Sequence, residues 1–115
     1  MPGSGSCVLV IAGETMGQGD PELGRRLLGN FLHALEAGRR FPDTICFYNE
    51  GVRLVVQGSP ALQNLQTLEA LGVRLLACRT CIEFYGLGDR VAVGTVGTMA
   101  DIVAALFDAG SVIRL

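Results

Sequence analysis

Five short runs along the chain are almost continuously apolar. Such runs are typical of strands that are buried on both faces of a parallel sheet. Each run begins or ends within two residues of a Gly, Asn or Asp, residues that often break regular structure. We predict strands over residues 7–13, 44–49, 73–77, 90–94 and 112–115.

The segments between these runs have a helical spacing of apolar residues. Asp20 and Pro21 suit the N-cap and first position of a helix that ends by Gly38, and Pro60 opens a second helix that Gly72 ends in the left-handed conformation. Residues 98–101 resemble a capping box for the last helix, residues 80–85 suit a short helix, and residues 52–57 suit a helical turn. The predicted buried stripes are Leu23, Leu27, Leu28, Phe31 and Leu35, then Leu62, Leu65, Leu68 and Leu71, then Ile102, Val103, Leu106 and Phe107.

Strands and helices therefore alternate from one end of the chain to the other. Alternation predicts right-handed crossovers and a mainly parallel sheet with helices on both faces. We expect a single α/β domain over residues 1–115, in which residues 1–6 form a loose N-terminal tail. Ligands of such sheets bind at the carboxyl ends of the strands, so the loops at 13–20, 49–52, 78–81 and 94–98 are the candidate site.

Composition narrows the possible partners. Charged residues make up 17% of the chain, against a typical value of about 25%. The shortage of charge suggests buried subunit interfaces, although a fully covered sheet explains it equally well. The net charge is −2 and the arginines form no basic stripe, which argues against nucleic-acid binding. The chain has no Lys, which excludes a Walker-type phosphate loop and a Lys Schiff base.

The sequence also bears on location. No apolar run approaches the roughly 20 residues that a membrane span needs, and the first residues lack the pattern of a signal peptide. We therefore expect a cytoplasmic protein without membrane contact. In a reducing compartment its four cysteines would be thiols rather than a disulfide framework.

The strongest chemical signal is the turn at residues 78–81, Cys-Arg-Thr-Cys. Cys78 follows a strand and precedes a helix, where unpaired N–H groups and the helix dipole favour a thiolate. Cys81 falls in the first turn of that helix, close enough to pair with Cys78. A nucleophilic or persulfide-carrying thiol is our preferred interpretation.

Three other interpretations remain open for this turn. A structural zinc site lacks a second Cys-x-x-Cys, because Cys7 and Cys46 read as core thiols and His33 as a surface residue. We therefore predict no metal and no cofactor. A thioredoxin-like dithiol is possible, and both cysteines could also simply pack as small apolar side chains.

Several residues on the other loops could complete the site. Thr15 belongs to a Gly-rich loop that could hold an anion, cover the cysteines as a lid, or serve only as a turn. Asn49 ends the second strand, where it could hold a substrate or the cysteine loop by hydrogen bonds or serve only as a turn residue, and Gly51 follows it. On the cysteine turn and its helix, we expect binding roles for Arg79, Thr80 and Tyr85.

Five segments in order carry a family resemblance: DPELG at 20–24, FYNEGV at 47–52, CRTCIEFYGL at 78–87, VGTV at 93–96 and MADI at 99–102. Together they resemble the DsrE-like superfamily. Within it, the chain is most similar to the C-terminal domain of YedF, a sulfurtransferase-like group associated with selenium metabolism. The resemblance covers residues 8–115, and residues 78–87 are its most specific part.

The resemblance implies a DsrEFH-like three-layer α/β/α fold with a five-stranded parallel sheet in the order 4-3-2-1-5. Relatives in sulfur relay carry sulfur as a cysteine persulfide on a cysteine eight residues before a Gly, which corresponds here to Cys78 and Gly86. Cys81 would then be a second, resolving thiol. Relatives also form trimers or hexamers. YedF-like proteins usually begin with a TusA-like domain, which has no counterpart in these residues.

We therefore expect a sulfur-relay protein, sulfurtransferase-like, with catalytic Cys78 and Cys81 and with donor and acceptor proteins that include a TusA-like carrier. Two alternatives remain. One is a non-catalytic oligomeric scaffold or binding module of the same fold. The other is a dithiol redox protein.

Overall fold

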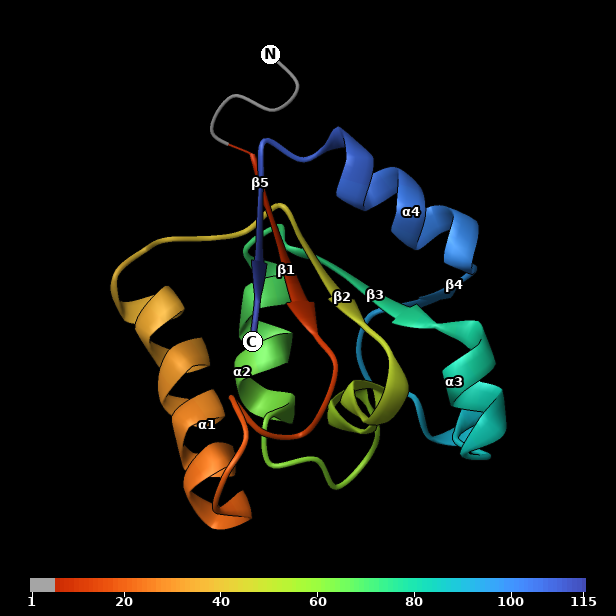
Figure 1. The fold of residues 1–115 in the computed structure, drawn as a ribbon, viewed down its shortest axis with the longest axis horizontal. Helices are drawn as coiled ribbons and strands as arrows, with labels where there is room; N and C mark the ends of the chain where they lie inside the picture. The colour runs from red at the N-terminus through yellow and green to blue at the C-terminus, as the bar shows by residue number, and fades with distance from the viewer. Residues whose placement is uncertain (1–5) are drawn as a thin grey trace.

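Five parallel strands form one sheet in the order β4-β3-β2-β1-β5 in the computed structural model, which describes residues 6–115 (Figure 1). The strands are β1 Cys7–Ile11, β2 Thr44–Phe47, β3 Arg74–Cys78, β4 Thr95–Gly97 and β5 Ser111–Arg114. The α-helices are α1 Pro21–Ala37, α2 Leu62–Ala70, α3 Arg79–Phe84 and α4 Met99–Asp108, and the 3-10 helices are η1 Asn49–Val55 and η2 Gly88–Arg90. The predicted α/β class, strand number and strand order are confirmed.

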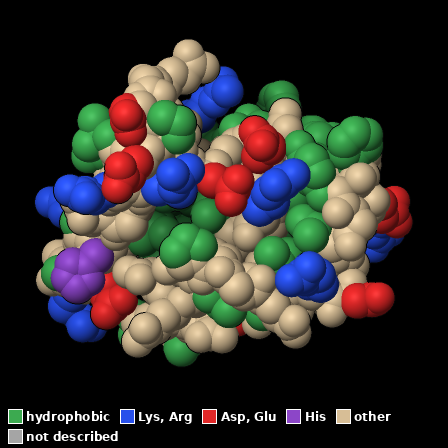
Figure 2. All heavy atoms as spheres, turned by 90° about the horizontal axis from the view of Figure 1, so that it is seen from below, with side chains coloured by type: hydrophobic (Ala, Val, Ile, Leu, Met, Phe, Trp, Pro, Cys, Tyr) green, Lys and Arg blue, Asp and Glu red, His purple; other side chains and the backbone are tan. Residues whose placement is uncertain are grey.

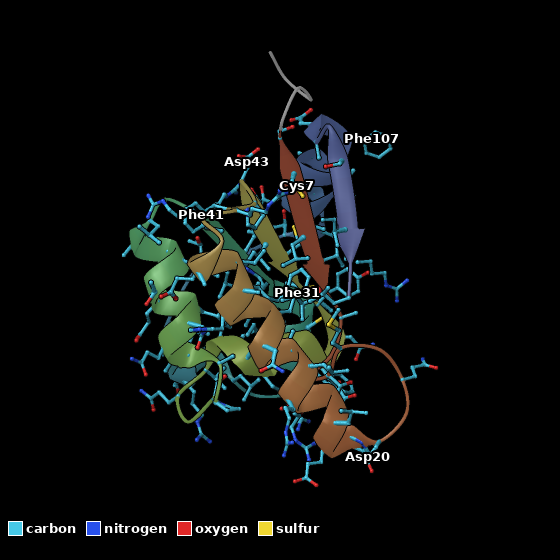
Figure 3. All side chains as sticks on the ribbon, turned by 90° about the vertical axis from the view of Figure 1, so that its left-hand side faces the viewer. Cys7, Asp20, Phe31, Phe41, Asp43 and Phe107 are labelled. Carbon is cyan, nitrogen blue, oxygen red and sulfur yellow. The ribbon has the colours of Figure 1, made fainter. Side chains whose placement is uncertain are left out.

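The helices form layers on both faces of the sheet. From β1 to β3 the chain moves step by step in one direction, so right-handed crossovers place α1 and α2 on the same face, where they contact each other. From β4 the chain returns across the sheet to β5, so α4 covers the opposite face (Figures 1 and 3). All strands consequently end at one edge of the sheet.

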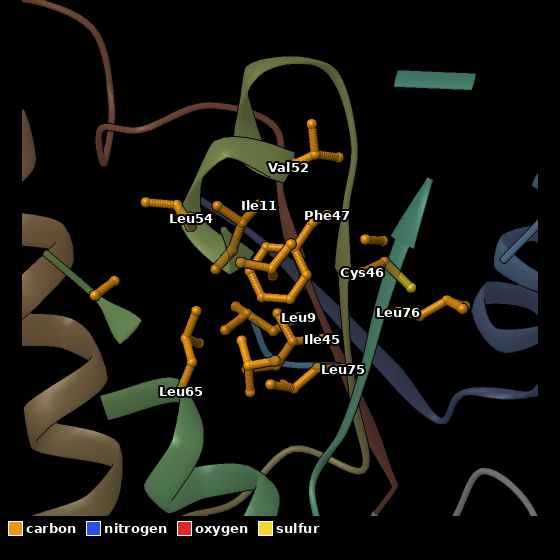
Figure 4. Packing of buried hydrophobic residues seen from close by; sticks show 14 of the residues in the cluster. Leu9, Ile11, Ile45, Cys46, Phe47, Val52, Leu54, Leu65, Leu75 and Leu76 are labelled. Atoms are coloured by element: carbon orange, nitrogen blue, oxygen red, sulfur yellow. The ribbon is translucent and has the colours of Figure 1, made fainter. Parts of the chain in front are cut away.

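The core is centred on the middle of the sheet. All four residues of β2 are buried, because strands lie on both sides of it and helices lie above and below. The ring of Phe47 lies among Leu9, Ile45 and Ile11 in the packed interior (Figure 4). A fully buried strand of this kind needs no polar alternation, which explains the continuous apolar run of β2. The apolar strand β5 differs from this expectation, since it lies at the edge of the sheet and all four of its residues are exposed.

The fourth strand was predicted too early in the sequence. Residues 90–94 were expected to form it, but β4 begins at Thr95. Arg90 ends η2, and Val91 makes only an antiparallel bridge with Val56. Gly94 has a φ of 80°, and a Cβ there would lie 2.9 Å from the Cβ of Leu75. The chain therefore turns at this glycine before it can pair with β3.

The buried stripes of the helices are narrower than predicted. In α1 the buried line is Gly24, Leu28 and Leu32, with Phe31 and Leu35 partly buried beside it. In α2 only Leu65 and Leu68 are buried, and in α4 only Ile102. The residues that were expected inside but are exposed are Leu23, Leu27, Leu71, Val103 and Phe107. Each lies at the border of its stripe or beyond its helix, where the spacing rule does not separate neighbouring faces.

The caps follow the prediction. Asp20 Oδ1 accepts the N–H of Leu23, and Pro21 takes the first helical position of α1. Thr98 and Asp101 form the predicted capping box of α4. Gly72 follows α2 with a φ of 101°.

The N-terminal prediction falls mainly outside the described residues, since the expected tail covers residues 1–6. Ser6 itself is bonded to the start of β5. Its Oγ accepts the N–H of Gly110 at 2.8 Å, and its carbonyl accepts the N–H of Ser111. Among residues 6–115, no helix has both the length and the apolar character required to cross a membrane.

Candidate functional site

The cysteine turn joins β3 to α3. Cys78 is the last residue of β3 and the N-cap of α3, and only 1% of its surface is exposed. Cys81 lies in the first turn of α3 and is partly exposed. The two thiols are free, and Cys78 is near enough to Cys81 to raise the pKa of its thiol. Cys78 therefore lies behind Cys81 as seen from solvent.

Asn49 supplies the main backbone contact to this pair. Its N–H donates to Sγ of Cys81 at 3.1 Å. Asn49 follows β2 with a φ of 52°, a left-handed conformation that Asn adopts more readily than most residues. The start of η1 therefore places an amide hydrogen on the Cys81 sulfur, where it stabilises negative charge.

Burial nevertheless raises the pKa of the Cys81 thiol above its ordinary value. The hydrogen bond and charge of Cys78 raise this pKa further, and the Asn49 N–H opposes them. Desolvation outweighs the amide contact at this sulfur.

Cys81 opens into a cavity of about 380 Å³, which we call the cysteine pocket. Its lining is mostly apolar, as is usual for small-molecule sites, and its volume is in their range. The lining residues are Tyr48, Asn49, Thr80, Cys81, Phe84, Tyr85 and Met99.

Tyr85 is the best-anchored ring of the pocket. Its hydroxyl donates to Oδ1 of Asn49 at 3.1 Å, and the ring of Phe84 meets it edge to face. The guanidinium of Arg53 lies 4.5 Å from the centre of the Tyr85 ring, which is cation–π distance. The contacts form a continuous series from the Cys81 sulfur through Asn49 and Tyr85 to Arg53.

The structure brings together five of the eight residues that the sequence proposed. Cys81, Asn49, Thr80 and Tyr85 line the cysteine pocket, and Cys78 contacts it through Cys81. The others lie elsewhere, as follows: Thr15 packs against Gly24 of α1, Gly51 against the carbonyl of Ile11, and Arg79 has its charge near Asp101.

Four residues of the site were not found from the sequence. Tyr48 and Phe84 directly precede Asn49 and Tyr85, so neighbouring residues could have indicated them. Met99 comes from the start of α4, and Arg53 from η1. No local pattern in the sequence points to these two, because the crossover from β4 and the turn of η1 bring them there.

The remaining cysteines and the histidine lie away from this pocket. Cys46 is buried in β2, and burial raises the pKa of its thiol. Cys7 was expected in the core but is only partly buried, and it lines a separate cavity of about 450 Å³ with Phe31 and Phe41 (Figure 3). His33 is exposed on α1, as predicted. Over residues 6–115, no group of three or more metal-ligating side chains occurs.

The carboxyl edge of the sheet carries charges of both signs. Figure 2 views this edge, and basic and acidic side chains alternate there with apolar ones. No large field of one sign covers the visible face. Recognition at this edge therefore depends on local groups rather than on long-range attraction.

This fold is shared with solved structures. A protein of unknown function from Methanobacterium thermoautotrophicum, MTH1491, has a TM-score of 0.70 at 23% identity, covering 96% of this chain and 98% of that one. The ychN protein from E. coli has a TM-score of 0.71 at 19% identity, with 96% and 98% covered. BT1422 from Bacteroides thetaiotaomicron, also of unknown function, has 0.69 at 14% identity, with 98% and 97% covered.

These likenesses show the fold. No protein-family model matches the chain. No curated protein matches it either.

Proposed function

We propose that the protein is a persulfide carrier of sulfur relay, in which Cys81 receives sulfur and Cys78 helps to release it. The observation that carries the proposal is the placement of two free thiols near each other, one partly exposed in a pocket and the other buried. A pocket with a nucleophile at its base suits a sulfur donor, and a second thiol within reach suits its discharge.

The loading step transfers one sulfur atom. The Cys81 thiolate attacks the outer sulfur of a donor persulfide, R–S–SH. The donor S–S bond breaks, a new S–S bond forms at Cys81, and the donor leaves as the thiolate R–S⁻. Cys81 then carries the persulfide Cys–S–SH, with no net oxidation or reduction.

Unloading can follow either of two routes. An acceptor thiolate can attack the outer sulfur and take it, which restores the Cys81 thiolate. Alternatively the Cys78 thiolate attacks the inner sulfur, forms a Cys78–Cys81 disulfide and expels HS⁻. The second route needs an external dithiol reductant before the next cycle.

The assignment of roles differs from the one that the family resemblance implies. That resemblance gives the carrier role to Cys78, but this side chain is almost completely buried. A donor in the cysteine pocket meets Cys81 first, since Cys81 lines the pocket and Cys78 does not. We therefore propose Cys81 as the receiving thiol and Cys78 as the resolving thiol.

The raised pKa of Cys81 is compatible with this role. A thiol of high pKa is mostly protonated near neutral pH, but its small thiolate fraction is strongly nucleophilic. The Asn49 N–H on Sγ stabilises the anion as it forms. The same contact stabilises the thiolate that remains after an acceptor takes the outer sulfur.

We also propose that the chain is a DsrE-like protein, most similar to the C-terminal domain of YedF. The shared α/β fold and the position of the cysteine turn at the end of β3 support this assignment. Its partners would be sulfur donor and acceptor proteins, including a TusA-like carrier, and further copies of itself in a trimer or hexamer.

A dithiol redox protein is the second candidate. The proximity of Cys78 and Cys81 favours it, because two free thiols three residues apart can form a disulfide if their geometry allows it. Such a protein would cycle between dithiol and disulfide with an external redox partner and would hold no persulfide.

Incubation with cysteine and a cysteine desulfurase, followed by intact mass measurement, tests the proposal. We expect the wild type and Cys78→Ser to gain one sulfur that a reductant removes, and Cys81→Ser to gain none. Cys7→Ser is the matched control and should load normally, since Cys7 lines a different cavity. Equal loading of Cys81→Ser would contradict the assignment, and reversible disulfide formation without any loading would favour the redox protein.

A further inference from the structure

Next to the cysteine pocket lies a second cavity of about 340 Å³, which we call the arginine pocket. Tyr85 lines both cavities, so the two are adjacent. Their characters differ. The cysteine pocket has a mostly apolar lining, whereas Glu14, Arg53, Gln57, Ser59 and Arg90 contribute polar groups to the arginine pocket.

The two arginines of this pocket come from segments that are joined by the backbone. Arg53 lies on η1, and its guanidinium stacks on the Tyr85 ring at 4.5 Å. Arg90 ends η2, its N–H donates to Leu87, and its carbonyl accepts the N–H of Gln57 at 2.9 Å. This bond fixes the backbone of Arg90 to the segment that follows η1, so both arginines project from connected supports.

The charge of the arginine pocket is positive. Two guanidinium groups face one carboxylate, that of Glu14. The charged residues of its lining therefore sum to one net positive charge. Glu14 also lines a smaller cavity together with Arg25. Guanidinium groups bind carboxylates through paired hydrogen bonds, so the two arginines suit a carboxylate ligand.

We propose that the arginine pocket binds a carboxylate of the sulfur donor while the donor's persulfide enters the cysteine pocket. The inference rests on the proposed function and names the donor class: a persulfide whose sulfur and carboxylate lie on one molecule and reach across Tyr85. The carboxylate is bound and released unchanged, so the loading step keeps the balance given above.

Tyr85 is the positioning residue between the two ends of such a donor. Its hydroxyl bonds to Asn49, whose N–H contacts the Cys81 sulfur, and its ring carries the Arg53 guanidinium. A donor whose carboxylate is paired with Arg53 is therefore held at a defined place relative to the thiol. A neutral donor lacks this anchor and reacts more slowly.

Two aromatic disulfides test this anion subsite without any sulfur carrier. Dithiobis-nitrobenzoate carries carboxylates, and dithiodipyridine is neutral; both react with a thiolate and release a coloured thiol. The rates are measured in a Cys7→Ser background, where Cys81 is the only partly exposed thiol among residues 6–115. We expect Arg53→Gln with Arg90→Gln to slow the anionic probe roughly tenfold more than the neutral probe at low salt.

The matched control is Arg40→Gln. Arg40 is also exposed, but it lines the cavity beside Cys7 at the amino edge of the sheet. Its loss should leave both rates unchanged. If the double variant slows both probes equally, the arginines act only on the shape of the site, and the proposal is overturned. If neither probe is slowed in the double variant, the proposal is overturned as well.

A second pair of probes identifies the source of the carboxylate. The persulfide of N-acetylcysteine is compared with that of its amide, and both with a cysteine desulfurase that carries a protein persulfide. A small-molecule donor is supported if the arginine substitutions slow only the acid form. A protein carboxylate is supported if they slow only transfer from the desulfurase. Selectivity for the anionic disulfide without stable persulfide would retain the subsite and reject the carrier function.

Discussion

Asn49 links the backbone to both the thiol and the ring of the site. Its N–H donates to Cys81, its Oδ1 accepts from Tyr85, and its own φ is positive. Few residue types satisfy all three conditions. Most are strained in the left-handed conformation, and most lack a side-chain oxygen that can accept a hydrogen bond at this distance from the backbone. The geometry of the cysteine pocket therefore depends on one residue at the end of β2.

The pKa of Cys81 is expected to fall in Cys78→Ala. The Cys78 side chain raises this pKa through its hydrogen bond and its charge, and the substitution removes both. The rate of Cys81 alkylation, followed against pH, should rise at a lower pH than in the wild type. Cys46→Ala is a control that leaves the pH dependence unchanged. An unchanged or higher midpoint in Cys78→Ala would mean that the two thiols do not interact.

Gly51 is expected to tolerate no side chain. A Cβ at this position would overlap the carbonyl oxygen of Ile11, which is backbone and cannot rotate away. Gly51→Ala should therefore lower the free energy of unfolding by about 1–3 kcal/mol, as overpacked cores do. Gly29→Ala is the matched control, since a Cβ there meets nothing within 4 Å. Equal denaturation midpoints for the two variants would contradict the account.

The sequence could predict only the local part of the site. Thr80, Cys81 and Tyr85 lie close together in the sequence, just after β3. Asn49 follows β2, which neighbours β3, so the strand order alone brings these residues together. Met99 and Arg53 arrive through tertiary packing. Their place depends on where α4 starts and how η1 turns, and neither is encoded in a short motif.

At the scale of elements, α4 differs most from its prediction. Four of its residues were expected to be buried. In the structure only a narrow line of its residues packs against β3 and β4. Phe107 consequently remains 84% exposed although its spacing matches the stripe. Spacing identifies an apolar side of a helix, but the neighbouring elements decide how much of that side is covered.

Two substitutions in α4 should lower the stability by very different amounts. Ile102 is buried against the sheet, so Ile102→Ala is expected to cost about 2–5 kcal/mol of stability. Phe107→Ala should change stability by less than about 0.5 kcal/mol, because its ring has little contact to lose. Urea denaturation of both variants measures this. A larger loss for Phe107→Ala would show that a partner surface covers it.

The capping box of α4 should contribute less stability in acid. The hydrogen bonds from Thr98 hold the pKa of Asp101 below its ordinary value. The stability that this carboxylate contributes is therefore present above its unfolded pKa and is lost as pH falls through the lower, folded pKa. Thr98→Ala should cost about 1 kcal/mol at neutral pH and reduce the loss on acidification. Identical acid titrations of variant and wild type would contradict this.

At the scale of the whole molecule, the alternation of elements was enough to predict the sheet. Continuous apolar runs predicted the parallel strands, although β5 is exposed rather than buried, and the resemblance supplied the order that the structure has. The error in β4 arose because Val91 and Val93 look like a strand, while Gly94 turns the chain after them. The site lies at the carboxyl ends of β2 and β3, where such sheets place ligands.

The number of copies in the assembly is a prediction at this scale. The low charge content and the resemblance lead us to expect a trimer or hexamer rather than a monomer. Light scattering coupled to gel filtration, over a range of protein concentrations, measures the molar mass directly. A mass of one chain, 12.1 kDa, at all concentrations would contradict this expectation.

The location of the transferred sulfur tests the central claim most directly. Trypsin cleaves after Arg79, so Cys78 falls in the peptide 75–79 and Cys81 in the peptide 80–90. After loading by a cysteine desulfurase and rapid alkylation, we expect the additional sulfur on peptide 80–90. Sulfur found on peptide 75–79 would mean that the buried thiol receives it and would contradict the roles proposed here.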